Sequence, residues 1–599
     1  MSLTPEQAAV IEQPFQNKLV CALPGSGKTH TTISLADRIL AYPHTSILMV
    51  TFTNAASTEM QTRIEKRLGP TSANRVKVKT FAKIMIEQHR PLLAGRRLIL
   101  GGELDSYINR VFKKLSIDWE QHQYFRERFD AYGRDLNWKY SPGIVTHDAY
   151  FELMNMLAIY QRVDLNTIAK EVVHALHAGT IKPLPFNFII VDEFQDTDLC
   201  QYSWLLAHRD PDRFMTVVGD DDQSIYSWRG AIGYQNMMSF VKDFSASTYI
   251  LNTCFRCSPY ILGTAQVLVE HNQKRIAKDM RAAKEELGHV GFVEYHPPSK
   301  QSAEERHDQE YNLIVDHIAP DYANWTVLAR TNLELDTLET YLSNRGIPAL
   351  RLGGKSIFDS PDVLSAIKLI YGLVYTKNIT PVIEGLAWLG ECEDVLQSVH
   401  ATGRYHGFSS ASLNGAQDYT VKLQALSTKI AFKSQNDAGL SYAQSAFSIA
   451  HNHFEILKLA KSTVSNPKIK LGALALVERI FMNMTGDITQ RAGALYELAT
   501  KGAKQKNTQD RAGKVVLCTL TGSKGLEWPK VMIINVNEGT IPSIHEDDID
   551  DKGNPSLDKL EEERRLLYVG MTRAEDELVL QFAMDKPSVF IKNLRPDIE

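Results

Sequence analysis

Residues 188–231 read FIIVDEFQDTDLCQYSWLLAHRDPDRFMTVVGDDDQSIYSWRGA, and this stretch decides the fold. It contains two short apolar runs, 189–191 and 215–218, and carboxylates follow each run. Short apolar runs bounded by polar residues are typical of buried parallel strands. In open α/β sheets, ligands bind beyond the carboxyl ends of such strands. The stretch therefore predicts two buried strands with acidic residues at a ligand site.

The polar residues after these runs have the chemistry of a nucleotide and nucleic-acid site. Asp192 and Glu193 follow the first run directly, so one carboxylate can hold Mg²⁺ while the next orients or deprotonates a water. The second run is followed by an amide, two aromatic rings and a guanidinium: Gln223, Tyr226, Trp228 and Arg229. Such a loop can sense phosphate at one end and stack bases at the other. A strand-end turn with incidental aromatics is the alternative for this stretch taken alone.

Residues 18–40, KLVCALPGSGKTHTTISLADRIL, supply the other half of a nucleotide site. They run from a strand-like segment through a glycine loop into a helix-like segment. Glycines let backbone N–H groups face phosphates, Lys28 can reach the β- and γ-phosphates, and the Thr29 hydroxyl can ligate Mg²⁺. The general GxxxxGK[ST] pattern is not fully met, because Ala22 stands at its first position. The two halves together predict a site for ATP and Mg²⁺.

These motifs, with others in the same order, resemble the superfamily 1A DNA helicases of the UvrD/Rep/PcrA class. The resemblance extends from residue 3 almost to the C-terminus. The matching segments are LTPEQ (3–7), ALPGSGKT (22–29), VDEFQDT (191–197), VGDDDQSIYSWRGA (218–231), LNTCFRC (251–257), TLTGSKGLEW (519–528) and EEERRLLYVGMTRA (561–574). The family also has alanine at the position of Ala22. Its LxxNYRS motif is replaced here by LNTCFRC, so Phe255 keeps an aromatic face and loses a hydroxyl.

The resemblance implies that ATP binds in the cleft between two motor domains. In that reading Gln7 recognises adenine, Phe255 stacks on it and Glu527 holds the ribose. The implied nucleotide-binding residues are Gln7, Pro24, Gly25, Ser26, Gly27, Lys28, Thr29, His30, Phe255, Arg256, Glu527 and Arg573. The implied metal ligands are Thr29 and Asp192.

The resemblance also implies how hydrolysis is coupled to DNA. Glu193 activates the water, and Arg256 and Arg573 reach the γ-phosphate from the other side of the cleft. The implied catalytic residues are Glu193, Lys28, Gln223, Arg256 and Arg573. The implied nucleic-acid contacts are Phe52, Tyr226, Trp228, Arg229, Arg330 and Asn332. Stacking tolerates any base and contributes about 1 to 3 kcal/mol per base, as a translocating protein requires.

Strand and helix signals divide the chain into two α/β units, each interrupted once. The resemblance implies that both are RecA-like doubly wound parallel-sheet motor domains with mostly helical insertions. We predict residues 1–85 and 181–275 for the first motor domain, 86–180 for its insertion, 276–375 and 509–599 for the second motor domain, and 376–508 for its insertion.

Composition limits the remaining choices. The 599 residues carry a formal charge of -5, so nucleic acid must be bound by local grooves and stacking rather than by a global basic field. Six sparse cysteines fit a reducing cytosol, and the CxxC spacing of Cys254 and Cys257 lacks the second pair of a metal site. No apolar run approaches the ~20 residues of a membrane span. We expect a cytoplasmic protein that does not enter a membrane.

The motifs and the resemblance together predict an ATP-dependent DNA helicase that acts on single-stranded DNA and at duplex junctions. The resemblance implies that it moves 3′ to 5′ and unwinds the duplex. One alternative is a single-strand translocase that displaces proteins or recruits partners and unwinds weakly by itself. Another is a non-enzymatic scaffold with an inactive nucleotide site, although Lys28, Asp192 and Glu193 argue against it. Protein partners in repair, replication or defence are all compatible with the sequence.

Overall fold

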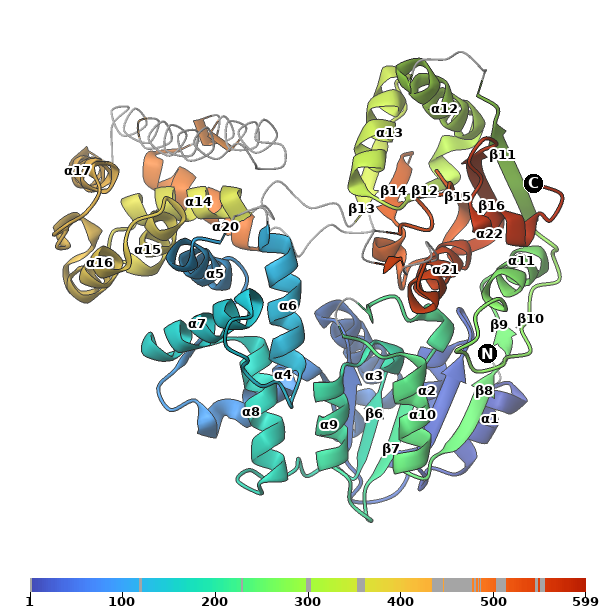
Figure 1. Ribbon diagram of the computed structural model, residues 1–599. Coiled ribbons are helices and arrows are strands. Elements are labelled where there is room, and N and C mark those ends of the chain that lie inside the picture. The colour runs from blue at the N-terminus through green and yellow to red at the C-terminus, as the bar shows by residue number, and fades with distance from the viewer. Residues whose placement is uncertain are drawn as a thin grey trace.

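Two six-stranded parallel sheets form the frame of the molecule (Figure 1). The strand orders are β3-β2-β6-β7-β1-β8 and β11-β16-β15-β12-β14-β13, and the neighbouring strands in both run parallel. The prediction of two doubly wound α/β units is confirmed. The computed structural model describes residues 3–117, 121–227, 230–297, 303–352, 361–433, 445, 477–478, 481–482, 484, 486–501, 513–544, 548–549 and 555–598.

The first sheet is apolar on both faces because helices cover both. Ile189 and Val191 belong to one core, whereas Phe188 and Ile190 belong to the core on the opposite face. This explains the continuous apolar runs in the sequence. The strands are β1 (Lys18–Ala22), β2 (Ile47–Thr51), β3 (Val76–Thr80), β6 (Phe188–Val191), β7 (Phe214–Gly219) and β8 (Ser247–Leu251). The helices are α1 (Pro5–Glu12), α2 (Lys28–Leu40), α3 (Asn54–Ala73), α4 (Phe81–His89), α9 (Leu199–Ala207) and α10 (Tyr234–Asp243).

The second sheet is built in the same way. Its strands are β11 (His289–Tyr295), β12 (Trp325–Ala329), β13 (Ala349–Leu352), β14 (Val515–Thr519), β15 (Trp528–Ile533) and β16 (Ala574–Ala583). Its helices are α11 (Pro259–Val269), α12 (Ala303–Ile318), α13 (Asn332–Asn344), α21 (Leu557–Met571) and α22 (Val589–Leu594). Three of its strands come from before residue 353 and three from after residue 513, so a long segment of chain separates the two halves of the sheet.

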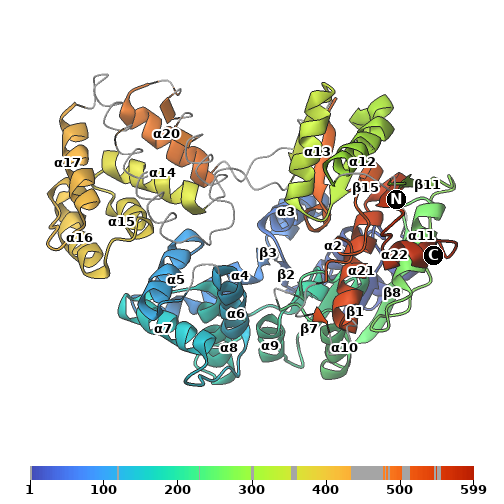
Figure 2. The same cartoon turned by 45° about the horizontal axis from the view of Figure 1, so that its top comes forward.

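Two helical groups lie beside the sheets, as Figures 1 and 2 both show. The first contains α5 (Gly102–Leu115), α6 (His122–Arg134), α7 (Val145–Ile159) and α8 (Leu165–His177), with the short strands β4 (Arg97–Leu98) and β5 (Arg162–Val163). The second contains α14 (Pro361–Val374), α15 (Ile379–Trp388), α16 (Glu393–His406), α17 (Asp418–Lys433) and α20 (Ile488–Lys501). The groups touch, since Arg110 pairs with Glu393 and Gln397 donates to the Tyr160 hydroxyl at 2.6 Å.

Three helices join a different hydrophobic core from the one that our predicted boundaries would give them. Helix α8 lies before residue 180 but packs into the core of the first sheet. Helix α11 lies before residue 275 but packs into the core of the second sheet. Helix α14 lies before the predicted boundary at residue 376 but packs into the core of the second helical group. The boundaries were placed where strand signals stop, whereas the apolar face of a helix decides which core it joins.

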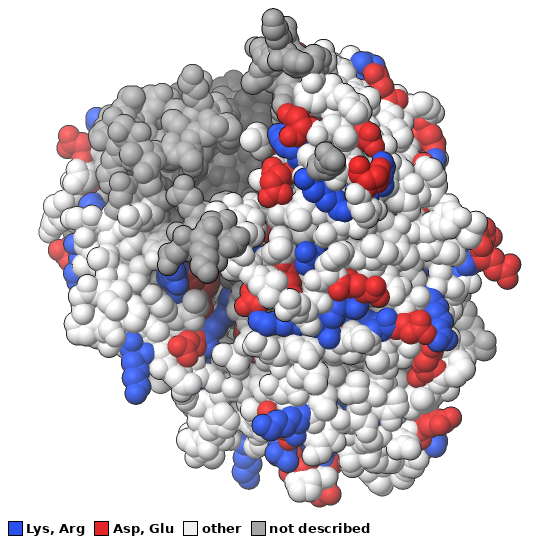
Figure 3. Space-filling model, turned by 45° about the vertical axis from the view of Figure 1, so that its right-hand side comes forward, with Lys and Arg blue, Asp and Glu red and all other residues white. Residues whose placement is uncertain are grey.

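The surface carries charges of both signs. On the face drawn in Figure 3, Lys and Arg side chains are interspersed with Asp and Glu, in keeping with the small net charge. Among the described residues, no helix is long and apolar enough to cross a membrane.

Candidate functional site

The glycine loop between β1 and α2 is shaped by two left-handed residues. Gly25 has a φ of 65° and Gly27 a φ of 78°. A Cβ atom on Gly25 would lie 2.4 Å from the Cβ of Arg256, and one on Gly27 would lie 2.9 Å from the Gln7 amide nitrogen. Glycine is therefore required both for the backbone conformation and for the close approach of two other segments. The loop leads directly into the N-terminus of α2, which favours an anion.

Gly25→Ala should destabilise the protein. A left-handed alanine costs about 1–2 kcal/mol, and the contact with Arg256 adds a steric cost, so we expect the free energy of unfolding to fall by about 2 kcal/mol or more. Chemical denaturation measures this difference. Gly263→Ala in α11 is the matched control, because its Cβ would meet nothing within 4 Å and alanine favours a helix by about 0.5–1 kcal/mol. Equal stability of the two variants would contradict the packing argument.

Two carboxylates follow β6 and face the glycine loop. Lys28 Nζ lies 3.8 Å from Glu193 Oε1, and Gln195 Nε2 donates to Glu193 Oε2 at 2.6 Å. Glu193 has a φ of 51°, an unusual conformation for a residue with a side chain and one that is common at functional sites. Burial opposes ionisation, but the charges of Lys28 and Lys524 hold the pKa of Glu193 at about 2. Glu193 is therefore ionised at neutral pH.

Asp192 has the features expected of a cation ligand. Within the described part of the chain, its Oδ1 atom is buried without a hydrogen-bond partner. Burial and the neighbouring charge of Glu193 raise the pKa of Asp192 to about 7. A buried carboxylate oxygen without a partner is normally satisfied by an ion or a water. A divalent cation fits here, because carboxylate oxygens are its preferred ligands. Thr29, the other predicted ligand, lies in the first turn of α2.

The segment before α11 brings an aromatic ring and a guanidinium to the glycine loop. The Phe255 N–H donates to the Gly25 carbonyl at 2.9 Å, and Phe255 is 41% exposed. Arg256 Nε donates to Glu527 Oε2 at 2.7 Å, and its Nη1 donates to the Thr572 carbonyl at 3.2 Å. Residues from both sheets thus meet beside the loop.

Arg573 and Gln223 form a second contact between the two sheets. Arg573 Nη2 donates to Gln223 Oε1 at 3.0 Å, and Gln223 Nε2 donates to Asp220 Oδ2 at 2.6 Å. Both side chains are nearly inaccessible. Burial and the nearby Arg256 lower the pKa of Arg573 to about 9, which leaves it cationic at neutral pH. The end of α21 is in this way bonded to the turn after β7.

Lys524 is a contact residue that the sequence reasoning missed. Its Nζ lies 2.6 Å from Asp196 Oδ2, donates to the Gln223 carbonyl at 2.9 Å and sits 4.8 Å from the centre of the Tyr226 ring. The available signal was its place in the turn after the apolar run 515–518, the same strand-end position that identified Asp192. Within TLTGSKGLEW, Glu527 is the one residue that we predict for the site.

The structure brings together some of the predicted nucleic-acid contacts. The Phe52 and Tyr226 rings are stacked, with centroids 5.9 Å apart and an interplanar angle of 10°. Arg330 pairs with Glu563 at 2.9 Å, and the Asn332 carbonyl accepts from Arg351 at 2.9 Å; both lie where β12 leads into α13. Trp228 and Arg229 lie outside the described residues.

The remaining predicted nucleotide residues support the loop in this structure. Gln7 Oε1 accepts from the Thr4 N–H at 3.1 Å, and Gln7 Nε2 donates to the Ser26 carbonyl at 3.1 Å. The Ser26 hydroxyl donates to the Leu23 carbonyl at 2.8 Å, and Pro24 between them is buried. His30, on α2, lies 3.3 Å from Arg67.

Comparisons with known proteins agree with this geometry. A family model described as the UvrD/REP helicase N-terminal domain matches residues 3–245, and one described as the UvrD-like helicase C-terminal domain matches residues 414–585. DNA helicase II of Haemophilus influenzae is 28% identical over 97% of this chain and 84% of its own length. ATP-dependent DNA helicase Rep of Escherichia coli is 27% identical over 98% of this chain and 91% of its own. ATP-dependent DNA helicase PcrA of Bacillus subtilis is 25% identical over 99% of this chain and 84% of its own length.

Proposed function

Because this chain belongs to the UvrD/Rep/PcrA class of helicases, we propose that it is an ATP-dependent DNA helicase that moves 3′ to 5′ on single-stranded DNA. The observation that carries the proposal is the turn after β7. Gln223 in this turn is bonded to Arg573 of the second sheet, and Tyr226, three residues later, stacks on Phe52. Gln223, which we take to sense the nucleotide, and a ring that can stack on bases therefore share one short loop.

ATP would bind with its phosphates over the glycine loop. Backbone N–H groups at the start of α2 and the Lys28 ammonium supply positive charge there. The exposed ring of Phe255, tied to the loop through its N–H, offers a flat surface for the adenine. Glu527 is 56% exposed and paired with Arg256, which suits a contact with the ribose hydroxyls.

The reaction would be hydrolysis of the bond between the β- and γ-phosphates of ATP by a water that Glu193 orients and deprotonates. Glu193 is ionised and so can accept a proton. Mg²⁺, held by Asp192 and Thr29, would supply positive charge to the phosphates. Arg256 approaches the glycine loop and Arg573 holds Gln223, so both guanidinium groups could stabilise the developing phosphoryl charge. Such cationic groups raise the rate of phosphoryl transfer by roughly 10³- to 10⁵-fold.

Strand movement would follow from the shared loop. When Arg573 moves with the second sheet, the Gln223 amide that it holds must change partner or move with it. The same loop carries Tyr226, whose ring also lies against the Lys524 ammonium. A change at the phosphate would in this way alter the grip on a stacked base. Partners in repair, replication or defence remain predictions.

We expect ATP turnover to be low without nucleic acid and to rise at least tenfold with single-stranded DNA, because the two binding functions share one loop. A steady-state ATPase assay with and without an oligonucleotide measures this ratio. Duplexes with a 3′ or a 5′ single-stranded tail give the polarity, and strand displacement separates an unwinding helicase from a translocase. Equal turnover with and without DNA would contradict the coupling.

A further inference from the structure

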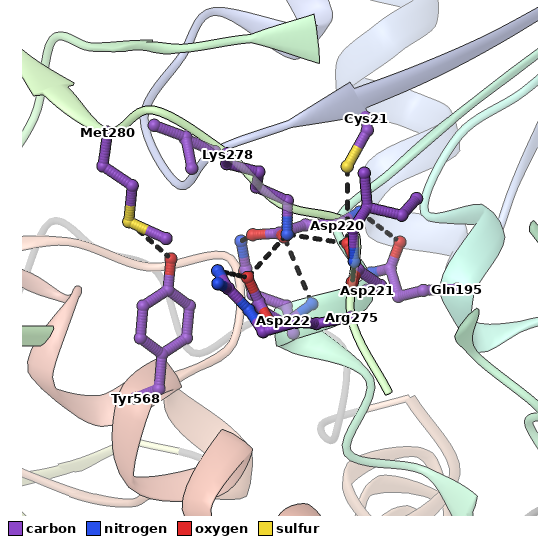
Figure 4. Close-up of polar contacts among 12 residues, drawn as sticks. Cys21, Gln195, Asp220, Asp221, Asp222, Arg275, Lys278, Met280 and Tyr568 are labelled. Atoms are coloured by element: carbon purple, nitrogen blue, oxygen red, sulfur yellow. Dashed lines mark hydrogen bonds and ion pairs between the residues drawn. The ribbon is translucent and has the colours of Figure 1, made fainter. Parts of the chain in front are cut away.

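Three consecutive aspartates after β7 form a buried acidic cluster, which Figure 4 shows. Asp220, Asp221 and Asp222 are between 0% and 2% exposed. Lys278 Nζ lies 2.9 Å from Asp220 Oδ1, 2.6 Å from Asp221 Oδ1 and 2.6 Å from Asp222 Oδ2. Burial disfavours the ammonium, but the three carboxylates hold the pKa of Lys278 well above its ordinary value. Within the described residues, Lys278 thus occupies the centre of a group that could otherwise hold a metal ion.

One carboxylate of this cluster also holds Gln223. Asp220 uses Oδ1 for Lys278 and Oδ2 to accept from Gln223 Nε2 at 2.6 Å. The Gln223 oxygen accepts from Arg573. A side-chain amide has one donor end and one acceptor end, so these two partners together fix its orientation. Without the Lys278 charge, Asp220 would be a buried carboxylate that has lost its cation, and such a group protonates or turns away.

The segment that carries Lys278 lies between the two sheets. Residues 272–282 follow α11 and precede β11. Asn272 Oδ1 accepts from Arg564 at 2.6 Å, and the Gln273 N–H donates to Glu561 at 2.6 Å, both on α21. On its other side, the Ile276 N–H donates to Asp221 Oδ2 at 2.7 Å. The segment is therefore bonded both to α21 of the second unit and to the aspartate turn of the first.

We propose that Lys278 is a positioning residue for ATP hydrolysis, which orients the Gln223 amide through Asp220 and ties that orientation to the place of α21. The inference rests on the proposed function, because it takes Gln223 to be the residue that links ATP to DNA. The competing explanation is that Lys278 only neutralises buried charge and contributes nothing but stability.

Lys278→Met separates these explanations when it is compared with Arg275→Met. Arg275 makes two hydrogen bonds to Asp222 in the same cluster, at 3.1 and 2.9 Å, and lies on the same segment as Lys278. Both variants remove one cation that pairs with the buried aspartates and should lower the melting temperature. We expect only Lys278→Met to reduce the DNA-stimulated kcat, by about tenfold or more, with the KM for ATP within about threefold of wild type. Equal kinetic losses in both variants would overturn the positioning role.

A double-mutant cycle with Gln223→Ala then tests the route. If Lys278 acts through Gln223, adding Lys278→Met to Gln223→Ala should lower kcat less than about twofold further. Multiplicative losses would reject the inference. A Gln223→Ala variant with normal DNA stimulation would instead reject the proposed role of Gln223. If Lys278→Met does not fold, Lys278→Gln, which keeps a donor without the charge, takes its place in the same cycle.

Discussion

Glu193→Gln should lose nearly all ATP turnover while its affinity for ATP stays within a fewfold of wild type. The amide has nearly the same shape as the carboxylate but cannot accept the proton of the attacking water, so kcat should fall by roughly 10²- to 10⁴-fold. Because Lys28 would lose its charged neighbour at 3.8 Å, ATP binding should if anything tighten. Single-turnover hydrolysis and titration with a fluorescent ATP analogue measure the two quantities separately.

Glu87→Gln is the matched control for this substitution. Glu87 also pairs with a lysine, Lys79, but on the surface of α4. Exposed pairs contribute only about 0–1 kcal/mol, so turnover should be unchanged. Near wild-type turnover in Glu193→Gln would assign the base to another residue.

Lys524→Met should uncouple ATP hydrolysis from DNA. The substitution removes three contacts of one ammonium, with Asp196, the Gln223 carbonyl and the Tyr226 ring. Even with Lys524 in place, burial raises the pKa of Asp196 to about 6, so without it we expect Asp196 to be protonated at neutral pH. DNA stimulation of ATP turnover should fall by about tenfold, because removing one partner of a buried charge pair leaves the other charge uncompensated. Steady-state ATPase assays over a range of DNA concentrations measure it.

Lys530→Met controls for the loss of a lysine from the same unit. Lys530 pairs with Asp321 and Glu577 and lies 5.5 Å from the centre of the Trp325 ring, so it has the same kinds of partner as Lys524 at a more exposed position. None of these three partners of Lys530 is Gln223 or Tyr226. If both variants lost DNA stimulation to the same degree, the link that we assign to Lys524 would not hold.

The sequence predicts the parts of this molecule that depend on local pattern. A buried strand followed by Asp192 and Glu193, and a glycine loop followed by Lys28, are both contained in short segments with a clear physical meaning. Both sheets follow from such segments. The two parallel sheets therefore follow from local patterns, whereas the close approach of Arg256 and Gln7 to the glycine loop does not.

The rest depends on contacts between distant segments. Lys524 meets Asp196 across 328 residues of chain, and no periodicity in either segment indicates the pairing. Lys278 stands in a stretch that looks like an ordinary polar linker, and only the fold shows it buried among three aspartates. Helices α8 and α11 pack into cores other than those that the predicted boundaries imply for the same reason, because an apolar helix face does not specify which core it covers.

At Glu193, with a φ of 51°, the backbone conformation favours glycine, whereas the proposed chemistry requires a carboxylate. Glycine at this position would relieve about 1–2 kcal/mol of conformational strain. It would also remove the carboxylate. With Glu193 in its proposed role as the base, selection for heat resistance alone would favour glycine at residue 193 at the expense of ATP turnover, a trade-off between stability and activity. Engineering of this enzyme for hot conditions should hold residue 193 fixed and seek stability elsewhere, for example at Gly263.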